Sequence, residues 1–459
     1  MWARHMLRSF AAVAFAFANT AGALAAVAQA RAGGEHPPYG ISSRNAPKAY
    51  LNMPHLASGA IPALLSQTGA FSDTRRLIPA EGLIPYDLVV AFWSDGASKT
   101  RWAAIPNKKI KFSATGEWVF PPGSVFVKTF ELPTDAADPS VKRRLETRLL
   151  VCDSAGGVYG VVYQWRPDHS EADLLSTSRT EDIPIKSASG DIHRQTWYYP
   201  SRPDCLACHN SKTSGVLGVK ARQMNHVFTY PSGVTDNELR TWNHLGLFAP
   251  TLNEADLAQI PTLAASDDTS RSLQDRARSY LDANCSQCHR PGGTVAYFDA
   301  RYDTPIEKQE LIDGPVLIDQ GIDRPRIIAP HDIWRSIAYM RVNTLDDIKM
   351  PPIARETIDR KGVELLQSWI TSLPGRSVLD PPILSPAGGT FSAPVEISLS
   401  EREPGADIRY TLDGSAPGAS DMRYEKPFKL TGPAVVRARA YKDGFTRSIT
   451  TQEVFIIGK

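Results

Sequence analysis

The sequence predicts a multidomain α+β protein with an antiparallel β domain, an α-helical domain and a C-terminal β module. Two observations predict this class. Aromatic and β-branched runs, separated by Gly, Pro, Asp and Asn, recur from about residue 80 to 200 and return at 381–459. Between them, apolar residues recur at helical spacing at 268–375. A length of 459 residues fits about two to four domains.

The first 30 residues are expected to be a secretory signal peptide rather than part of the fold. A basic start precedes an apolar run at 10–27, and residues 28–30 are Ala-Gln-Ala, a small-x-small cleavage site. The alternative is an uncleaved membrane anchor. No later stretch approaches the roughly 20 apolar residues that a spanning helix needs. We therefore expect a periplasmic or secreted protein without a stable membrane span.

The charge balance of the exported chain argues against some partners. Removal of residues 1–30 takes away Arg4 and Arg8 and no acidic residue, which leaves 49 basic and 49 acidic residues. Proteins that bind nucleic acid or an anionic membrane surface usually carry a basic excess. We therefore expect neither as the main partner.

Residues 31–75 are expected to be a lead-in rich in small residues, ahead of the β domain at 76–264. Strands of this domain are predicted at 89–93, 118–120, 124–130, 145–151 and 158–165. Gly156-Gly157 lies between the last two runs and predicts a hairpin turn. Cys152 lies at the end of a strand-like run, and we expect it to be a buried structural thiol.

Two short segments carry the pattern Cys-x-x-Cys-His. The first contains Cys205, Cys208 and His209, and the second contains Cys285, Cys288 and His289. This is the attachment pattern of c-type haem, because two thiols one helical turn apart can add to both vinyl groups while the histidine faces the iron. With 5 Cys and 10 His in the chain, about 0.001 matches are expected by chance. We predict two covalently bound haem c groups, with His209 and His289 as iron ligands.

Other uses of four paired cysteines fit less well. A zinc ribbon places its pairs about 15–20 residues apart, whereas 76 residues separate Cys208 from Cys285. Disulfides, or a single thioredoxin-like redox pair, would not account for a histidine directly after both pairs. We therefore keep haem attachment as the prediction, with haem 1 at the first segment, beside the β domain, and haem 2 at the second.

The second segment lies within the layout of a small helical haem domain at 268–375. A helix is predicted to run from Leu273 into Cys285, and a closing helix covers 363–370 before Pro374 ends it. This arrangement leaves a loop-rich section between the haem segment and the closing helix.

Met350 lies in that section and precedes a proline. A loop stiffened by proline can hold a thioether against the distal face of the iron, and His/Met ligation raises the haem potential. We expect Met350 to be the distal ligand of haem 2. The alternatives are an ordinary loop and Met340, which lies on a helix-like stretch at 333–341 where packing is the expected role.

The distal ligand of haem 1 stays open at the level of sequence. The candidates are Met53, His193, Met224, His226 and His244. Met224 and His226 lie only 15 and 17 residues beyond His209, a short path to the opposite haem face. Each of them alone is more often a packed or solvated residue, and Met53 is expected on a surface loop. The remaining alternative is an iron without a protein ligand on that face.

Residues 381–459 are expected to form a separate β module behind a proline- and glycine-rich linker. Strands are predicted at 408–412 and 435–441, with a turn at Asp413-Gly414. Alternation places Val436, Ala438 and Ala440 on one face, while Arg437 and Arg439 are expected to point to solvent.

The haem residues and Met350 carry a resemblance to the class I cytochrome c domain over 268–375. More widely, residues 65–375 resemble a family of secreted bacterial dihaem c-type proteins. The matching strings are 66–71, 93–97, 146–150, 199–201 leading into Cys205, and 276–284. These resemblances imply two haem-bearing domains and support an architecture more than an activity.

Residues 381–457 resemble the immunoglobulin-like module at the C-terminus of chitobiases and β-hexosaminidases. The match is carried by 409–417, 436–440, Tyr424, Pro427, Gly444 and Ser448. In that family the module is an appended sandwich, so the resemblance implies an immunoglobulin-like β-sandwich and no hydrolase activity.

A β domain that ends in Cys-x-x-Cys-His is also similar to the small β-sheet haem proteins. Some of these oxidise hydroxylamine at a five-coordinate haem that is cross-linked to a lysine. If this resemblance holds, Lys128, inside the run 126–130, is the lysine expected to be cross-linked to the haem.

These observations support three hypotheses about function. The first is a periplasmic dihaem cytochrome that transfers single electrons between redox partners through two six-coordinate haems. The second is a haem oxidoreductase, with an open catalytic haem 1 for hydroxylamine, nitric oxide or peroxide and haem 2 as electron relay. The third is a binding protein that docks a protein or glycan through 381–459.

Overall fold

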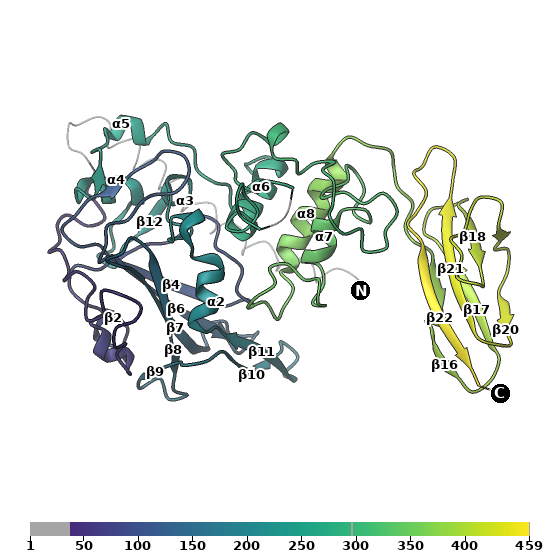
Figure 1. Ribbon diagram of the computed structural model, residues 1–459, viewed down its shortest axis with the longest axis horizontal. Helices are drawn as coiled ribbons and strands as arrows, with labels where there is room; N and C mark the ends of the chain where they lie inside the picture. Colours follow the sequence, from purple (N-terminus) through teal and green to yellow (C-terminus); the bar gives the residue numbers. More distant parts are fainter. Residues whose placement is uncertain (1–36, 295–296, 459) are drawn as a thin grey trace, which may run out of the picture.

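The computed structural model describes residues 37–294 and 297–458, so the predicted signal peptide lies outside the described residues. The chain forms a mixed α+β protein built mostly of strands in several sheets, which confirms the coarse fold class. Figure 1 shows a β-rich part at one end, a helical part in the middle and a β module at the other end. None of the described helices is long and apolar enough to cross a bilayer.

A six-stranded antiparallel sheet forms the centre of the β-rich part, with strand order β3-β4-β6-β7-β8-β9. Its strands are β3 (Ile84–Pro85), β4 (Ser98–Ala104), β6 (Val125–Pro133), β7 (Lys142–Cys152), β8 (Val158–Trp165) and β9 (Ala172–Leu174). The predicted runs 124–130, 145–151 and 158–165 fall in β6, β7 and β8, so these three predictions are confirmed. Cys152 is buried at the end of β7, as expected.

Two predicted strands are wrong. Residues 89–93 form no strand, and within 118–120 only Val119 makes an isolated bridge, to Lys111. Their apolar side chains have other roles, because Val90 and Phe92 line a cavity and Trp118 is buried in an aromatic cluster. Hydrophobic character was therefore a sign of burial at these positions, not of strand pairing.

Shorter strands and helices surround the central sheet. The strands are β1 (Phe71–Asp73), β2 (Ile78–Pro79), β5 (Ile110–Lys111), β10 (Arg179–Lys186), β11 (Ile192–Tyr199), β12 (Val227–Thr229), β13 (Thr235–Asn237) and β14 (Phe248–Ala249). The helices are η2 (Leu65–Thr68), α2 (Arg202–Cys208), η3 (Ser211–Thr213), α3 (Ala221–Met224), α4 (Glu238–His244) and α5 (Glu254–Leu257). The hairpin of β10 and β11 is followed directly by α2.

The lead-in packs on one face of the central sheet. Leu65 and Phe71 share a core with Trp102, Val127 and Leu149. In the same core Met53 is only 4% exposed, so its expected place on a surface loop is wrong. The sheet face explains the difference, since a sheet buries an apolar face only where another segment covers it.

The opposite face of the sheet is covered in part by α3 and α4. Phe126 and Leu150 belong to a core with Met224 and Trp242. Further along this face, Phe130 belongs to a second apolar core with the hairpin of β10 and β11. The stretch of sheet between these two cores faces a cavity instead of another element.

The helical part contains α6 (Leu273–Cys285), η4 (Ile306–Lys308), α7 (Ile337–Val342) and α8 (Arg360–Ser372). The predicted opening helix agrees with α6, which Ser272 caps by accepting a hydrogen bond from the Asp275 amide. The predicted closing helix agrees with α8, whereas α7 is shorter than the expected helical stretch at 333–341. Helices α6 and α8 pack together through a shared apolar core, as Figure 1 shows.

The C-terminal module consists of two sheets that share one core. The three-stranded sheet contains β15 (Ile383–Ser385), β17 (Val395–Ser400) and β20 (Phe428–Leu430). The five-stranded sheet contains β16 (Gly389–Phe391), β18 (Asp407–Thr411), β19 (Met422–Arg423), β21 (Ala434–Tyr441) and β22 (Thr451–Ile457). Val436, Ala438 and Ala440 are fully buried, as the alternation predicted.

The expectation that Arg439 points to solvent is wrong. Its side chain is only 8% exposed and lies 3.6 Å from a carboxylate oxygen of Asp323, in the helical part. Asp323 also pairs with Arg335 at 3.1 Å and with Arg447 at 3.0 Å. One carboxylate therefore joins the helical part to two arginines of the C-terminal module, and this joint explains the buried cation.

Replacement of Asp323 by Ala is expected to lower the free energy of unfolding by about 1–3 kcal/mol, because Arg335 and Arg439 lose a shared partner while mostly buried. Urea unfolding of wild type and Asp323→Ala measures this effect. Asp443→Ala is the matched control, since Asp443 is exposed in the same module. Equal stability of all three proteins would contradict the importance of this joint.

The same joint predicts a pH dependence of stability. Burial alone would raise the pKa of Asp323, but Arg335, Arg447 and Arg439 outweigh it and hold that pKa below its usual value. The carboxylate therefore contributes fully above about pH 4, the ordinary value of an unfolded aspartate, and its contribution is lost as the pH falls through the folded pKa. Asp323→Ala should thus destabilise the protein less at acidic pH than at pH 7.

Candidate functional site

The first Cys-x-x-Cys-His segment lies on α2, directly after the hairpin of β10 and β11. Ser201 begins the helix, and its amide and hydroxyl both donate to the carboxylate of Asp204 at 2.8 Å. These two hydrogen bonds from Ser201 to Asp204 fix the first turn. Cys205 and Cys208 then lie one turn apart, and His209 ends the helix.

The second segment begins at the last residue of α6, where Cys285 ends the helix. The amide of His289 donates to the carbonyl of Cys285 at 2.9 Å, so this segment continues in a helical turn. The thiol of Cys288 interacts with the thiol of Cys208 in the first segment. Two segments that are far apart in the sequence therefore meet in space.

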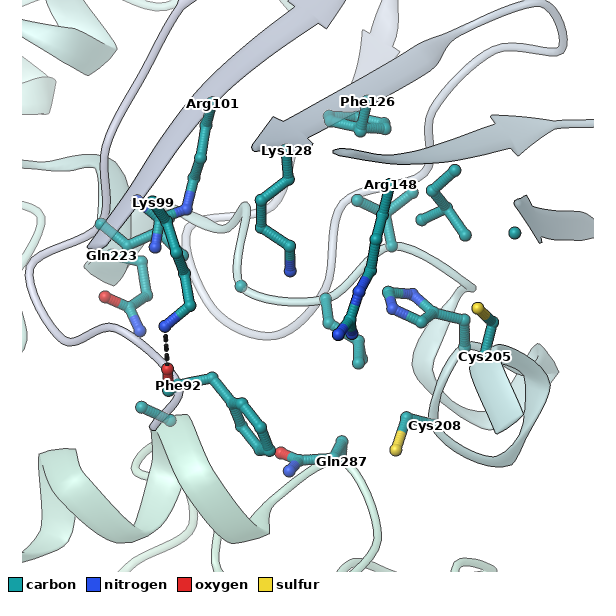
Figure 2. A pocket seen from close by; sticks show the side chains of 18 of the residues that line it. Phe92, Lys99, Arg101, Phe126, Lys128, Arg148, Cys205, Cys208, Gln223 and Gln287 are labelled. Atoms are coloured by element: carbon teal, nitrogen blue, oxygen red, sulfur yellow. Dashed lines mark hydrogen bonds between the residues drawn. The ribbon is translucent and has the colours of Figure 1, made fainter. Parts of the chain in front are cut away.

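A cavity lies where the segments meet, and Figure 2 shows its walls. Its empty space, the open mouth included, is about 1470 Å³. One wall is the central sheet, and α2 with its two cysteines and His209 forms another. The end of α6, with Ser286 and Gln287, and the loop residues Ile353 and Ala354 complete the lining. The cavity is thus shared by the β-rich and helical parts.

Gly160 of β8 lets α2 approach the sheet. A Cβ atom at this position would lie 2.7 Å from the Cβ and 2.8 Å from the Sγ of Cys205. Non-bonded carbon and sulfur atoms do not approach each other this closely, so any side chain at residue 160 would displace the cysteine. The missing side chain therefore sets where Cys205 enters the cavity.

His209 presents one ring nitrogen to the cavity. Its Nδ1 lies 2.8 Å from the carbonyl oxygen of Gly215, and a carbonyl can only accept, so Nδ1 carries the proton. The lone pair of Nε2 is then available to bind a metal ion. Burial, followed by the charge of Lys128, lowers the pKa of His209 to about 4. The imidazole is therefore neutral at pH 7, the form that binds metals.

His289 is also a neutral imidazole, on a half-buried side chain. Its ring stacks on Phe298 with centroids 4.3 Å apart, and burial followed by the charge of Arg341 lowers its pKa to about 4. In the described part of the chain its Nδ1 has no hydrogen-bond partner. A buried polar atom without a partner costs about 1–3 kcal/mol, so such a ring needs a functional reason.

Met350 lies half-buried in the loop between α7 and α8. Its amide donates to the carbonyl of Arg341 at 2.9 Å. Arg341 is the residue whose charge acts on His289. The loop that carries Met350 is thus anchored beside the second segment. Met340 lies half-buried on α7.

The Met350 loop is clamped to the β-rich part by Asp95. The Asp95 carboxylate accepts hydrogen bonds from the amide of Glu356 at 3.0 Å, the amide of Thr357 at 2.8 Å and the hydroxyl of Thr357 at 2.9 Å. Asp95 lies in the string 93–97 and adopts a positive φ of 50°. That string therefore contains a turn that docks the Met350 loop.

The cavity wall formed by the sheet is cationic. Lys99 and Arg101 extend from β4, Lys128 from β6 and Arg148 from β7, and Figure 2 shows all four pointing into the cavity. Burial, followed by the charges of Arg148 and Arg101, lowers the pKa of Lys128 to about 7. Arg148 has a raised pKa, because Glu146 outweighs the effect of its burial.

None of the five sequence candidates for the distal ligand of haem 1 is among the residues that line the cavity. Met53 and Met224 are packed in separate apolar cores. His226 pairs with Glu238 at 3.1 Å, and His244 stacks on Tyr39 at 3.5 Å. His193 is exposed on β11.

Sequence reasoning missed most of the cationic wall. It singled out Lys128, which the structure places in the cavity, but not Lys99, Arg101 or Arg148. A usable signal was present for Arg148, which lies within the predicted run 145–151 on the same side as the buried Leu150. Lys99 and Arg101 lie outside every predicted run. A charge at an inward position of a predicted strand is a sign of a site.

All five cysteines are free thiols. No group of three or more His, Cys, Asp or Glu side chains is arranged to hold a metal ion in the described ranges. The structure thus contains no disulfide between the described cysteines.

Comparison with known families matches residues 386–452 to the chitobiase/beta-hexosaminidase C-terminal domain. The match confirms the resemblance of the C-terminal module. It lies outside the cavity and outside both Cys-x-x-Cys-His segments. No curated protein matches the chain.

Replacement of Asp95 by Ala is expected to release the Met350 loop, because three hydrogen bonds from Glu356 and Thr357 lose their acceptor. Each lost partner of a buried donor costs about 1–3 kcal/mol. Hydrogen exchange at the amides of Glu356 and Thr357 should accelerate at least about tenfold, which corresponds to about 1.4 kcal/mol. Asp347→Ala, an exposed change in the same loop region, is the control, and equal exchange in both variants would contradict the clamp.

Proposed function

We propose that the protein is an exported dihaem c-type cytochrome that transfers single electrons between redox partners. The observation that carries this proposal is that the two Cys-x-x-Cys-His segments meet through Cys208 and Cys288. They meet beside a cavity that Cys205, Cys208 and His209 line and to which the second segment contributes Ser286 and Gln287. Export would follow from the signal peptide expected at 1–30, outside the cytoplasmic membrane where c-type haem is attached.

The residues around the first segment fit a haem. Cys205 and Cys208 would form its thioether bonds, and Nε2 of His209 would bind the iron, while Gly215 orients the ring. The position of Gly160 supports this assignment, because it leaves the space in which Cys205 meets the cavity.

The second segment would hold the other haem through Cys285, Cys288 and His289. Met350 is the proposed distal ligand, on a loop anchored beside that histidine. Bound haem supplies a one-electron carrier, and the protein sets its potential through axial ligands, burial and nearby charge. The contact of Cys208 with Cys288 supports transfer between the two haems, since both would be attached at adjoining thiols.

A second candidate function is a haem oxidoreductase with an open haem 1. One observation favours it: among the described residues that line the cavity, His209 is the only His or Met. An iron held there would have no second histidine or thioether within its own pocket. Hydroxylamine, nitric oxide and peroxide are the small substrates to test, with haem 2 as relay.

The C-terminal module supports a further role in attachment. It belongs to a domain type that accompanies glycan-degrading enzymes, and it is joined to the helical part through Asp323. We propose that this module docks a glycan or a redox protein partner. A chain that ends before residue 381 should keep its haems and lose this attachment.

The first experiment is haem quantification in the purified exported protein, followed by carbon monoxide titration of its reduced form. The proposal expects two covalent haems per chain by mass and by pyridine haemochrome absorbance. No binding of the gas supports two capped irons and electron transfer, whereas one molecule per chain supports the open haem. A chain without covalent haem would refute both functions.

Replacement of Met350 by Ala should open the iron of haem 2, so the reduced protein gains about one carbon monoxide site per chain and one potential falls. Met422→Ala, at an exposed position of the C-terminal module, is the control. If Met340→Ala has the effect and Met350→Ala does not, the ligand assignment moves to α7. An unchanged spectrum and potential would remove Met350 from the site.

Replacement of Gly160 by Ala should displace Cys205 and prevent its thioether bond. Covalently bound haem is then expected to fall from two to about one per chain, while the second segment remains loaded. Gly432→Ala is the matched control, because no atom lies within 4 Å of the Cβ that it adds. Full loading of Gly160→Ala would contradict the role of the close approach.

A further inference from the structure

Three cations lie directly opposite one another across three strands of the central sheet. In the register of the sheet, Arg101 of β4 faces Lys128 of β6, and Lys128 faces Arg148 of β7. All three line the cavity. We call Arg101, Lys128 and Arg148 the cation row; Figure 2 shows their charged ends turned toward the same space.

The place of the row in the sheet is unusual. On one side it is bordered by Phe126 and Leu150, which belong to one apolar core, and on the other by Phe130, which belongs to another. Alternation would put an apolar side chain at such a position. Like charges directly opposite in a sheet also repel one another. The row is therefore costly for stability and requires a compensating negative charge.

The protein supplies only part of that charge. Arg101 pairs with Asp87, and Arg148 pairs with Glu146 at 2.5 Å. In the described residues the ammonium of Lys128 has neither a hydrogen bond nor an ion pair, and it lies 5.2 Å from the centroid of the Phe130 ring. The middle member of the row thus lacks a counter-charge.

Other charges around the cavity do not fill this gap. Glu117 pairs with Arg290 at 2.7 Å, and Asp282 pairs with Lys220 at 2.6 Å. Lys99 donates to the carbonyl oxygen of Phe92 at 2.6 Å. Glu117 and Asp282 thus each have their own cation. Asp204, the third carboxylate among the described lining residues, accepts hydrogen bonds from Ser201 and Tyr198. None of the three forms an ion pair with the ammonium of Lys128.

We propose that the cation row is a binding site for an oxyanion, either a carboxylate or an inorganic oxyanion, with Lys128 at its centre. Guanidinium groups bind planar oxyanions through paired N–H donors, and an ammonium adds a point charge. Arg101 and Arg148 would hold the anion from both sides. This inference rests on the proposed function, because the cation row lies in the cavity in which haem 1 is proposed to bind.

Two sources can supply this chemistry. One is a haem propionate, which would occupy the row permanently in the loaded protein. The other is a free oxyanion that enters through the open mouth of the cavity. Both need the positive charge of Lys128, and they differ in whether added anion has an effect.

The experiment uses the full-length, haem-loaded protein with Lys128→Gln, Lys128→Arg and, as control, Lys142→Gln. Lys142 is exposed on β7, in the same sheet. Haem per chain is measured first, and a value of zero refutes the proposed function without deciding the anion site. Phosphate binding is then measured by calorimetry at constant ionic strength, and both haem potentials are measured in chloride.

The propionate source predicts that Lys128→Gln lowers one haem potential and that phosphate has no effect on any protein. The free-anion source predicts saturable phosphate binding to wild type that Lys128→Gln weakens at least about tenfold, which corresponds to about 1.4 kcal/mol. In both cases Lys128→Arg and Lys142→Gln should resemble wild type. The proposal is overturned if Lys128→Gln equals wild type in both measurements, or if Lys128→Arg fails as Lys128→Gln does. If Lys128→Gln does not fold, Arg101→Gln takes its place in both measurements, because it also removes one charge of the row, and the same results are expected from it.

Discussion

Buried ion pairs between the β-rich and helical parts are the constraint on which the cavity depends. Lys220 pairs with Asp282 at 2.6 Å, and Arg290 pairs with Glu117 at 2.7 Å, with nearly all of these side chains removed from solvent. A buried charge that loses its partner costs about 3–5 kcal/mol, so only a placement that makes both pairs is acceptable. That placement brings the end of α6 to α2, and it brings the two Cys-x-x-Cys-His segments together.

The central sheet shows how one surface can serve stability and chemistry at once. Its first face is continuous apolar core under the lead-in. Its second face is apolar at both ends and cationic in the middle, where Lys128 meets the cavity. The sheet tolerates this row because the flanking cores hold the strands in register. Gly160, on the same face, gives up side-chain packing so that Cys205 can reach the same space.

Whether a sequence-based prediction agrees with the structure depends on how far apart in the sequence the interacting residues lie. Helices α6 and α8 and strands β6, β7 and β8 were predicted well, because their periodicity is a local property. Residues 89–93 do not form the predicted strand, because Val90 and Phe92 face a cavity that other segments create. The predicted exposure of Arg439 was wrong because its partner, Asp323, lies more than a hundred residues earlier in the sequence.

The sequence by itself determined the two Cys-x-x-Cys-His segments, the mixed α+β class and the C-terminal module, since each depends on short-range spacing or periodicity. Only the tertiary structure decided that the segments meet at one cavity and that Lys128 stands there between two arginines. It also decided that Asp95 holds the Met350 loop. These contacts join residues 20 to more than 250 positions apart, and no local pattern encodes which distant partner a charge will find.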